Sequence, residues 1–200
     1  MIAVINLGNS NLQSVINALN SLEADYFVTD KSEELFKCDK IILPGVGSFS
    51  SGINRLKELK LFDFLKNEIQ FENKQFLGIC LGMQMLFDSS EEDNHESKGL
   101  GLISGKIVQL PKSEKYKIPR IGWGQSNVNF DFLGLSKGEL IDFYYIHSFY
   151  AKPKDSSIIS IHSDNEIASA IKLKNIYGCQ FHPEKSHKNG LKILNTFISL

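Results

Sequence analysis

The chain alternates short apolar runs with segments whose apolar residues recur at helical spacing. The apolar runs occupy residues 2–7, 26–29, 40–43 and 76–80. Between them, apolar residues return every three or four positions, which predicts one helix over 12–22 and one broken or two short helices over 56–69. Strands that are apolar throughout need cover on both faces, and strands alternating with helices pair in parallel. We therefore predict an α/β fold with a mostly parallel central sheet flanked by helices.

The pattern changes in the C-terminal half. Runs that alternate apolar and polar residues predict strands at 105–110, 143–151, 156–163, 167–173 and 176–181. We expect these runs to add an antiparallel extension to the sheet, and a last helix to cover residues 189–200. A helical pattern also follows residue 80, through Met83 to Phe87, and the acidic segment 89–98 reads as a solvated surface loop. A length of 200 residues suits a single domain, residues 1–200.

Charge and composition narrow the classes of partner. The chain has 22 Lys and Arg against 23 Asp and Glu, and a net charge of −1 argues against nucleic acid and anionic membranes. No apolar run approaches the ~20 residues that span a bilayer, and the N-terminus does not resemble a signal peptide. Three cysteines do not read as a disulfide framework, so we expect a reducing, cytoplasmic setting. No Cys/His spacing indicates a metal, and we expect no cofactor.

Cys80 lies where a predicted strand meets a predicted helix, inside Gly78-Ile79-Cys80-Leu81-Gly82. Glycines two before and two after a nucleophile permit the sharp turn known as a nucleophile elbow. Such a turn exposes the sulfur, the helix N-terminus favours the thiolate, and the Leu81 N–H points toward a developing oxyanion. Cys38 and Cys179 lack this frame, and a buried structural role fits them better.

A thiol nucleophile needs a base, and the base needs an orienting group. His182 follows a predicted strand and precedes Pro183, which biases it toward an extended backbone and presents the ring from a rigid corner. Glu184, two residues on, can hold the imidazole in one tautomer. His147, in another predicted strand, could compete as base, although no carboxylate is near it in sequence.

Three segments, in this order, resemble the motifs of the class I, triad-type glutamine amidotransferases. These are Pro44-Gly45-Val46-Gly47, the run Gly78 to Gln84, and the run Gln180 to Ser186, and together they span nearly the whole chain. The resemblance implies a glutaminase in which Cys80 is the nucleophile, His182 the base and Glu184 its orienter.

The resemblance also implies the remaining parts of the site. In the family, Val46, Gly47 and Leu81 would build the oxyanion hole after a peptide rearrangement within residues 44–47. The substrate, L-glutamine, would be held by a further set of residues. These are Gln84, His147 and Ser148.

Within the family, the chain is similar to free-standing subunits that supply ammonia to a (β/α)8-barrel cyclase in histidine biosynthesis. The similarity rests on the Gly8–Leu12 turn, Gly122-Trp123, the strand Tyr144 to Ser148, and Lys185-Ser186. It implies that the partner binds the face of the chain that carries four particular residues. These are Asn11, Trp123, Tyr144 and Lys185.

Several positions depart from the pattern of those subunits, and they leave alternatives open. The departures are Asn6-Leu7, Ser10, Gly124 and Phe149. None of them touches the triad, so they leave the implied glutaminase chemistry unchanged and bear only on the identity of the partner. The first alternative is therefore a paralogue that feeds another synthase, such as one that amidates a bacterial surface sugar. The second is a binding module, or a hydrolase that reuses a Cys elbow. Retention of Cys80, His182 and Glu184 speaks against an inactive module.

Overall fold

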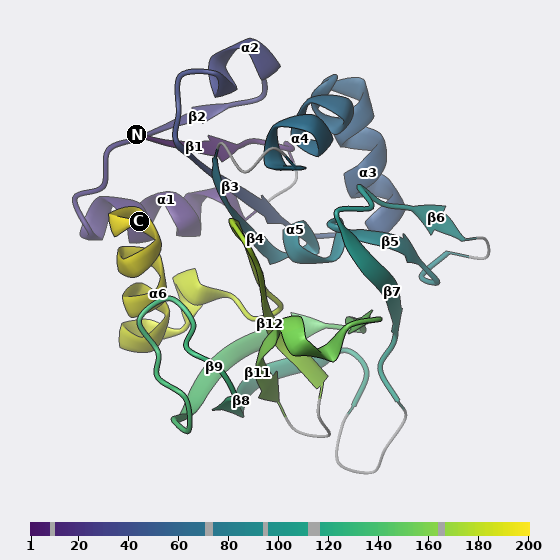
Figure 1. Cartoon of the computed structure of the whole chain (residues 1–200), viewed down its shortest axis with the longest axis vertical. Coiled ribbons are helices and arrows are strands. Elements are labelled where there is room, and N and C mark those ends of the chain that lie inside the picture. Colours follow the sequence, from purple (N-terminus) through teal and green to yellow (C-terminus); the bar gives the residue numbers. More distant parts are fainter. Residues whose placement is uncertain (9–10, 71–73, 94–95, 112–116, 164–166) are drawn as a thin grey trace.

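The computed structural model describes residues 1–8, 11–70, 74–93, 96–111, 117–163 and 167–200 (Figure 1). Ser10 and His95 lie outside these ranges. The helices are α1 (Leu12–Ser21), α2 (Ser32–Leu35), α3 (Phe49–Glu58), α4 (Leu61–Gln70), α5 (Leu81–Gln84) and α6 (His187–Ser199), with 3-10 turns η1 (Ser156–Ile158) and η3 (Pro183–Lys185). Among the described residues, no helix is long and apolar enough to cross a membrane.

Nine strands form one sheet in the order β2-β1-β3-β4-β13-β12-β11-β8-β9 within the described chain. The first five are β2 (Tyr26–Thr29), β1 (Ile2–Ile5), β3 (Lys40–Gly45), β4 (Gln75–Cys80) and β13 (Ile176–Cys179), all paired in parallel. The other four are β12 (Ile167–Leu173), β11 (Ile159–Ser163), β8 (Arg120–Val128) and β9 (Leu140–His147), paired antiparallel. The α/β class and the antiparallel extension are therefore confirmed.

Among the described residues, a second sheet of four strands has the order β10-β7-β5-β6. Its members are β5 (Phe87–Ser90), β6 (Ser97–Lys98), β7 (Ile103–Gln109) and β10 (Phe149–Pro153). The sequence did not separate this sheet from the first. The predicted run 143–151 is in fact two strands, because the chain leaves the large sheet at Ser148 and continues as β10 against β7.

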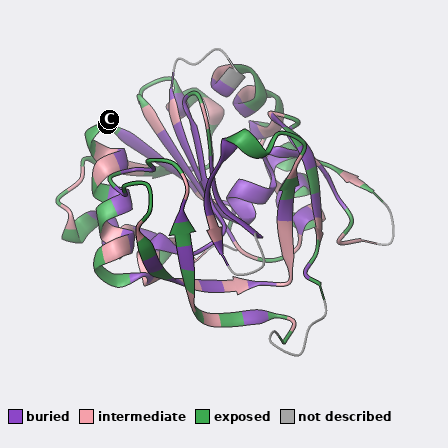
Figure 2. Ribbon diagram, turned by 60° about the horizontal axis from the view of Figure 1, so that its bottom comes forward, coloured by how far each residue is buried: buried purple, intermediate pink, exposed green. Residues whose placement is uncertain are grey.

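Two apolar cores lie on opposite faces of the parallel strands. Alternate residues of β1 show this directly: Ile2 and Val4 pack in one core, and Ala3 and Ile5 in the other. The first core also takes the apolar faces of α1 and α6, and the second takes those of α3 and α4. Figure 2 shows the buried residues gathered along the central strands. Burial on both faces is the reason that β1, β3 and β4 are unbroken apolar runs, whereas β2, at the edge of the sheet, is only partly buried.

The structure differs from the sequence-based expectations in three details. The helix after Cys80 ends at Gln84, because Phe87 to Ser90 pair with β7 as a strand. β8 was not predicted, because its inward positions include Arg120, two glycines and a serine while Ile121 and Trp123 are exposed, which hides the usual alternation. The run 176–181 was expected in the antiparallel extension, but its strand β13 lies at the junction of the two parts of the sheet. It pairs antiparallel with β12 and parallel with β4.

Candidate active site

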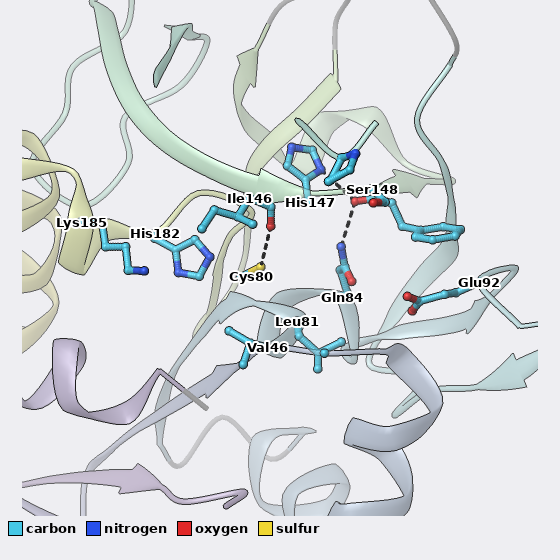
Figure 3. Close-up of a pocket in the computed structure, with 13 residues that line it drawn as sticks. Val46, Cys80, Leu81, Gln84, Glu92, Ile146, His147, Ser148, His182 and Lys185 are labelled. Carbon is cyan, nitrogen blue, oxygen red and sulfur yellow. Dashed lines mark hydrogen bonds between the residues drawn. The ribbon is translucent and has the colours of Figure 1, made fainter. Parts of the chain in front are cut away.

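A pocket of about 240 Å³ opens at the carboxyl ends of β3, β4 and β13 (Figure 3). Open α/β sheets usually bind ligands at this edge of the strands. The end of β9 and the start of β10 form its opposite wall. The pocket is lined by Val46, Gly47, Cys80, Leu81, Gln84, Glu92, Pro119, Ile146, His147, Ser148, Phe149, His182 and Lys185. Most of the residues singled out in the sequence are therefore brought together.

Cys80 occupies a strained turn between β4 and α5. Its φ of 54° and ψ of −108° are unusual for a residue with a side chain, and such strain is often found at functional sites. The two flanking glycines make the turn possible. A Cβ atom at Gly78 would lie 2.7 Å from backbone atoms of Gly82, and one at Gly82 would overlap the carbonyl oxygen of Leu43. The structure thus has the elbow geometry that the glycine spacing predicts.

The Cys80 sulfur has polar neighbours on several sides. It lies 3.7 Å from the carbonyl oxygen of Ile146, to which the thiol can donate, and 3.7 Å from the side-chain nitrogen of Gln180. The His182 side chain also hydrogen-bonds to it. The other two cysteines have different surroundings: burial raises the pKa of both the Cys38 and the Cys179 thiols, which keeps them neutral.

His182 is held at both its ring and its backbone. Nδ1 lies 2.8 Å from Oε1 of Glu184, whose side chain is only 1% exposed. The His182 backbone N–H donates to Tyr144 O at 2.9 Å, and the Ser186 hydroxyl donates to His182 O at 2.7 Å. These contacts leave Nε2 to face the thiol. The contact with Glu184 fixes which ring nitrogen faces the thiol.

The two histidines of the pocket have opposite electrostatic environments. Burial lowers the pKa of His182, but hydrogen bonds and charge interactions with Cys80 and Glu184 outweigh it and raise the pKa to about 10. Burial lowers the pKa of His147 to about 4, with Arg120 adding to the effect. His147 Nδ1 bonds to Phe149 O at 2.9 Å, and Nε2 is buried with no partner among the described residues. The geometry pairs His182, rather than His147, with both a thiol and a carboxylate.

The remaining predicted substrate residues line the far side of the pocket. The Gln84 side-chain nitrogen donates to Phe149 O at 3.0 Å and to Gln180 Oε1 at 3.0 Å. Ser148 lies between the two strands that form the wall. Val46 and Gly47 follow β3 directly, and Gly47 has a φ of 102°, a conformation that favours glycine.

Three of the four predicted interface residues, Asn11, Trp123 and Tyr144, contact residues 182–187. The fourth, Lys185, belongs to that segment. Asn11 is closer to the site than expected: its amide lies 3.5 Å from Oε1 of Glu184. Trp123, 50% exposed, stacks on His187 with ring centroids 5.1 Å apart and packs edge-on against Tyr144. Lys185 follows Glu184 in η3 and lines the pocket. The predicted interface residues therefore lie beside the predicted catalytic ones.

Two residues of the site were missed in the sequence. Glu92, read as part of a solvated loop, lines the pocket, and its carboxylate accepts the Phe49 N–H at 2.6 Å. Burial raises the pKa of Glu92. Nothing in the acidic run distinguishes Glu92, because the β5–β6 connection alone brings it to the start of α3. Gln180 belongs to the motif that contains His182, but nothing in the sequence indicates its role.

No group of three or more His, Cys, Asp or Glu side chains is placed to hold a metal ion in the described ranges. The chemistry that the arrangement can support is covalent. A thiol, an imidazole beside it and a carboxylate behind the imidazole are the parts of a nucleophilic triad, and the backbone N–H after the elbow is the usual oxyanion donor.

Known proteins are similar to this chain along its whole length. A family model described as glutamine amidotransferase class-I matches residues 3–200. The imidazole glycerol phosphate synthase subunit HisH 2 of Methanococcus maripaludis is 43% identical over 203 residues, covering 99% of this chain and 98% of the relative. The HisH subunit of Bacillus subtilis is 40% identical over 206 residues, covering 100% and 96%. The chain therefore belongs to the class-I glutamine amidotransferase family and is an enzyme.

Solved structures show the same fold. A crystal structure described as a glutamine amidotransferase has a TM-score of 0.78 and 14% sequence identity, and the match covers 100% of this chain and 99% of the other. At that identity the likeness concerns the fold alone. The relatives at about 40% identity bear instead on which member of the family this chain is.

We predict that neither pocket histidine titrates between pH 5.5 and 8.5. His182 should stay charged through this range, because its pKa is raised to about 10, and His147 should stay neutral, because its pKa is lowered to about 4. The charge interactions of His182 therefore stabilise the fold fully below its unfolded pKa of ~6.5, and are lost as pH rises through 10. The neutral state of His147 stabilises it above ~6.5, and this is lost as pH falls through 4.

Imidazole NMR shifts recorded across this pH range would measure both states directly. In Cys80→Ser the pKa of His182 should fall, because the contribution of the thiol is removed, while that of His147 should hold. A His182 midpoint near pH 6.5 in the unaltered protein would contradict the assignment of charge.

Proposed function

We propose that this chain is the glutaminase subunit of an imidazole glycerol phosphate synthase, which hydrolyses L-glutamine to glutamate and ammonia for histidine biosynthesis. The observation that carries the proposal is the Cys80–His182–Glu184 arrangement, with Cys80 and His182 lining one pocket, in a chain similar to HisH subunits from end to end. We propose one catalytic domain over residues 1–200, acting in the cytoplasm. The three thiols, all free here, would stay reduced in that compartment.

The first half-reaction makes a thioester. With the proton of the thiol already held on His182, the Cys80 sulfur attacks the side-chain amide carbon of glutamine as a thiolate. Negative charge on the amide oxygen is met by backbone N–H groups of Leu81 and of the Val46-Gly47 segment. His182 then gives its proton to the departing nitrogen, ammonia leaves, and a γ-glutamyl thioester remains on Cys80.

The second half-reaction releases glutamate. A water molecule loses a proton to His182 and attacks the thioester, and the sulfur leaves as thiolate. Glu184 holds the ring and stabilises its positive charge in both halves, from a position that is almost fully buried. Two steps of moderate barrier replace one difficult amide hydrolysis.

Glutamine enters with its side-chain amide toward Cys80 and its α-substituents toward the opposite side of the pocket. We propose that Glu92 receives the α-ammonium group, because it is the carboxylate that lines that side (Figure 3). The Phe49 N–H fixes one of its oxygens and leaves the other for a ligand. Gln84, His147 and Ser148 complete the substrate-binding wall.

The partner in this proposal is a (β/α)8-barrel cyclase. It would bind the face that carries Asn11, Trp123, Tyr144 and Lys185, and would cover the mouth of the pocket. Trp123 supports this orientation, because a half-exposed tryptophan held by stacking is a typical interface anchor. Ammonia released at Cys80 would then enter the barrel before bulk water could protonate it.

We predict that Cys80→Ala lowers glutamine hydrolysis by ~10³-fold or more, since the members of a triad act as a unit. His182→Ala should cost nearly as much, and Glu184→Gln less, because Glu184 only orients the ring. The glutamine analogue 6-diazo-5-oxonorleucine should label Cys80 alone, which peptide mass spectrometry would locate. An adduct on Cys38 or Cys179, or full activity in His182→Ala with none in His147→Ala, would overturn these roles.

We predict that Glu92→Gln raises KM for glutamine by about tenfold or more and changes kcat much less, because the lost contact is to a non-reacting group. Glu91→Gln is the matched control, since Glu91 is in the same acidic run but does not line the pocket. Equal KM values for the two variants would remove Glu92 from the substrate site.

A second candidate function is supply of ammonia to a different synthase. One relative, from Methanococcus maripaludis, is named subunit HisH 2. A numbered name suits an organism with more than one such subunit, and this favours retaining the second candidate function. The departures at Asn6-Leu7 and Gly124 point the same way. Gly124 packs against Arg120 and Tyr145, where a larger residue would collide with the Arg120 side chain.

Complementation separates the two functions. A bacterium that lacks its own histidine-pathway glutaminase subunit, given this gene together with the gene of its barrel partner, should grow without histidine at low ammonium. Cys80→Ala in the same plasmid is the control and should not support growth. Failure of the unaltered gene, with glutamine-dependent amidation of a sugar by the purified protein, would assign the second function.

A further inference from the structure

A buried chain of hydrogen bonds joins the wall of the pocket to the Cys80 sulfur. The Phe149 carbonyl oxygen accepts from Gln84 Nε2, and the same nitrogen donates to Gln180 Oε1, both at 3.0 Å. Gln180 Nε2 then lies 3.7 Å from Cys80 Sγ. Gln180 is fully buried and Gln84 is 6% exposed, so the chain is shielded from solvent.

The peptide carbonyl of Phe149 dictates the polarity of this chain. A carbonyl oxygen can only accept, so Gln84 must turn its NH₂ group toward Phe149 and, at the same place, toward Gln180. Gln180 must therefore accept this hydrogen bond with its side-chain oxygen. Its own NH₂ group is therefore forced toward Cys80. The reversed orientation would set two oxygens against each other at the Phe149 end.

A second contact reinforces the same polarity. His147 Nδ1 also bonds to Phe149 O, at 2.9 Å, so Nδ1 must carry the proton. The carbonyl is thus held by two donors from two elements, β9 and α5. The orientation of Gln84, and through it that of Gln180, depends on a fixed backbone group.

The carbonyl group of Ile146, the other polar neighbour of the sulfur, is the reason that a hydrogen-bond donor would stabilise a thiolate here. Cys80 can donate its thiol proton to the carbonyl oxygen of Ile146, 3.7 Å away. When the proton resides on His182, that carbonyl oxygen faces a negative sulfur, which is unfavourable. An N–H group aimed at the sulfur offsets the repulsion, and hydrogen bonds to a charged partner are about twice as strong as neutral ones.

We propose that Gln180 is a further catalytic residue, whose amide N–H stabilises the Cys80 thiolate that attacks the substrate. The inference rests on the proposed role of Cys80 as nucleophile. Gln180 precedes the triad base by two residues on the chain segment that leaves β13, so one segment supplies both the base and the thiolate donor.

The test measures the thiolate without glutamine, in the purified full chain. The rate of iodoacetamide alkylation at Cys80, followed by peptide mass spectrometry across pH, reports the thiolate fraction. Gln180→Met removes the donor at similar size. Gln180→Glu keeps an oxygen for Gln84 and, when ionised, offers no N–H. Gln109→Met is the matched control, since Gln109 is exposed on β7 outside the pocket.

Both Gln180 variants should raise the pH midpoint of alkylation by about one unit or more, which corresponds to a tenfold change in the ionisation constant. Their kcat/KM should fall by about tenfold or more at neutral pH and should recover as pH rises. Gln109→Met should match the unaltered protein. Thermal unfolding of each variant identifies any that fails to fold. If Gln180→Met does not fold, Gln180→Glu provides the test.

An unchanged midpoint in a folded Gln180 variant, or a loss of activity that is the same at every pH, would overturn the proposal. Its failure differs from failure of the proposed function. Labelling by the glutamine analogue on another residue would remove Cys80 as nucleophile, whereas the alkylation midpoint reads only the contact between Gln180 and the sulfur.

Discussion

The parallel pairing of β13 with β4 is the interaction on which the site depends. It joins segments about 100 residues apart in sequence and aligns Gly178 with Gly78 and Cys179 with Ile79. Both strands end at the same edge of the sheet, so Cys80 leaves one and the segment to His182 leaves the other. A slip of one residue would turn every side chain of β13 to the other face. The register therefore fixes the distance between Cys80 and His182, the proposed nucleophile and base.

The charges of the site follow from the groups buried beside each histidine. Glu184 and Cys80 stabilise a proton on His182, whereas burial, with a smaller contribution from Arg120, lowers the pKa of His147 and keeps it neutral. His182 is a charged imidazolium beside the sulfur, whereas His147 is a neutral ring in the wall of the pocket. The two histidines therefore differ in charge although they look alike in sequence. Tyr144, which accepts the His182 N–H, also packs against Trp123, so the outer face of β9 contacts the triad segment directly.

Much of the fold could be predicted because burial leaves a pattern in the sequence. β1, β2, β3 and β4 read as apolar runs, and the glycines around Cys80 report a turn that no larger residue would fit. The sequence could not reveal long-range placement. Nothing local says that the run after Ile176 inserts beside β4, that residues 143–151 divide between two sheets at Ser148, or that Glu92 turns inward. Gln180 was likewise hidden, because its role depends on the direction of hydrogen bonds across three elements.

The central claim is that this glutaminase works for a partner, and its turnover tests that claim most directly. The segment after β3, with Gly47 at a φ of 102°, is the element that we expect a bound partner to rearrange into the oxyanion hole. Steady-state glutamine hydrolysis should be measured for the isolated chain and for the chain with its barrel cyclase and acceptor substrate. We predict slow turnover alone and a stimulation of about 100-fold or more in the complex, which needs only ~2.7 kcal/mol of coupling. High turnover that is independent of the partner would contradict the account.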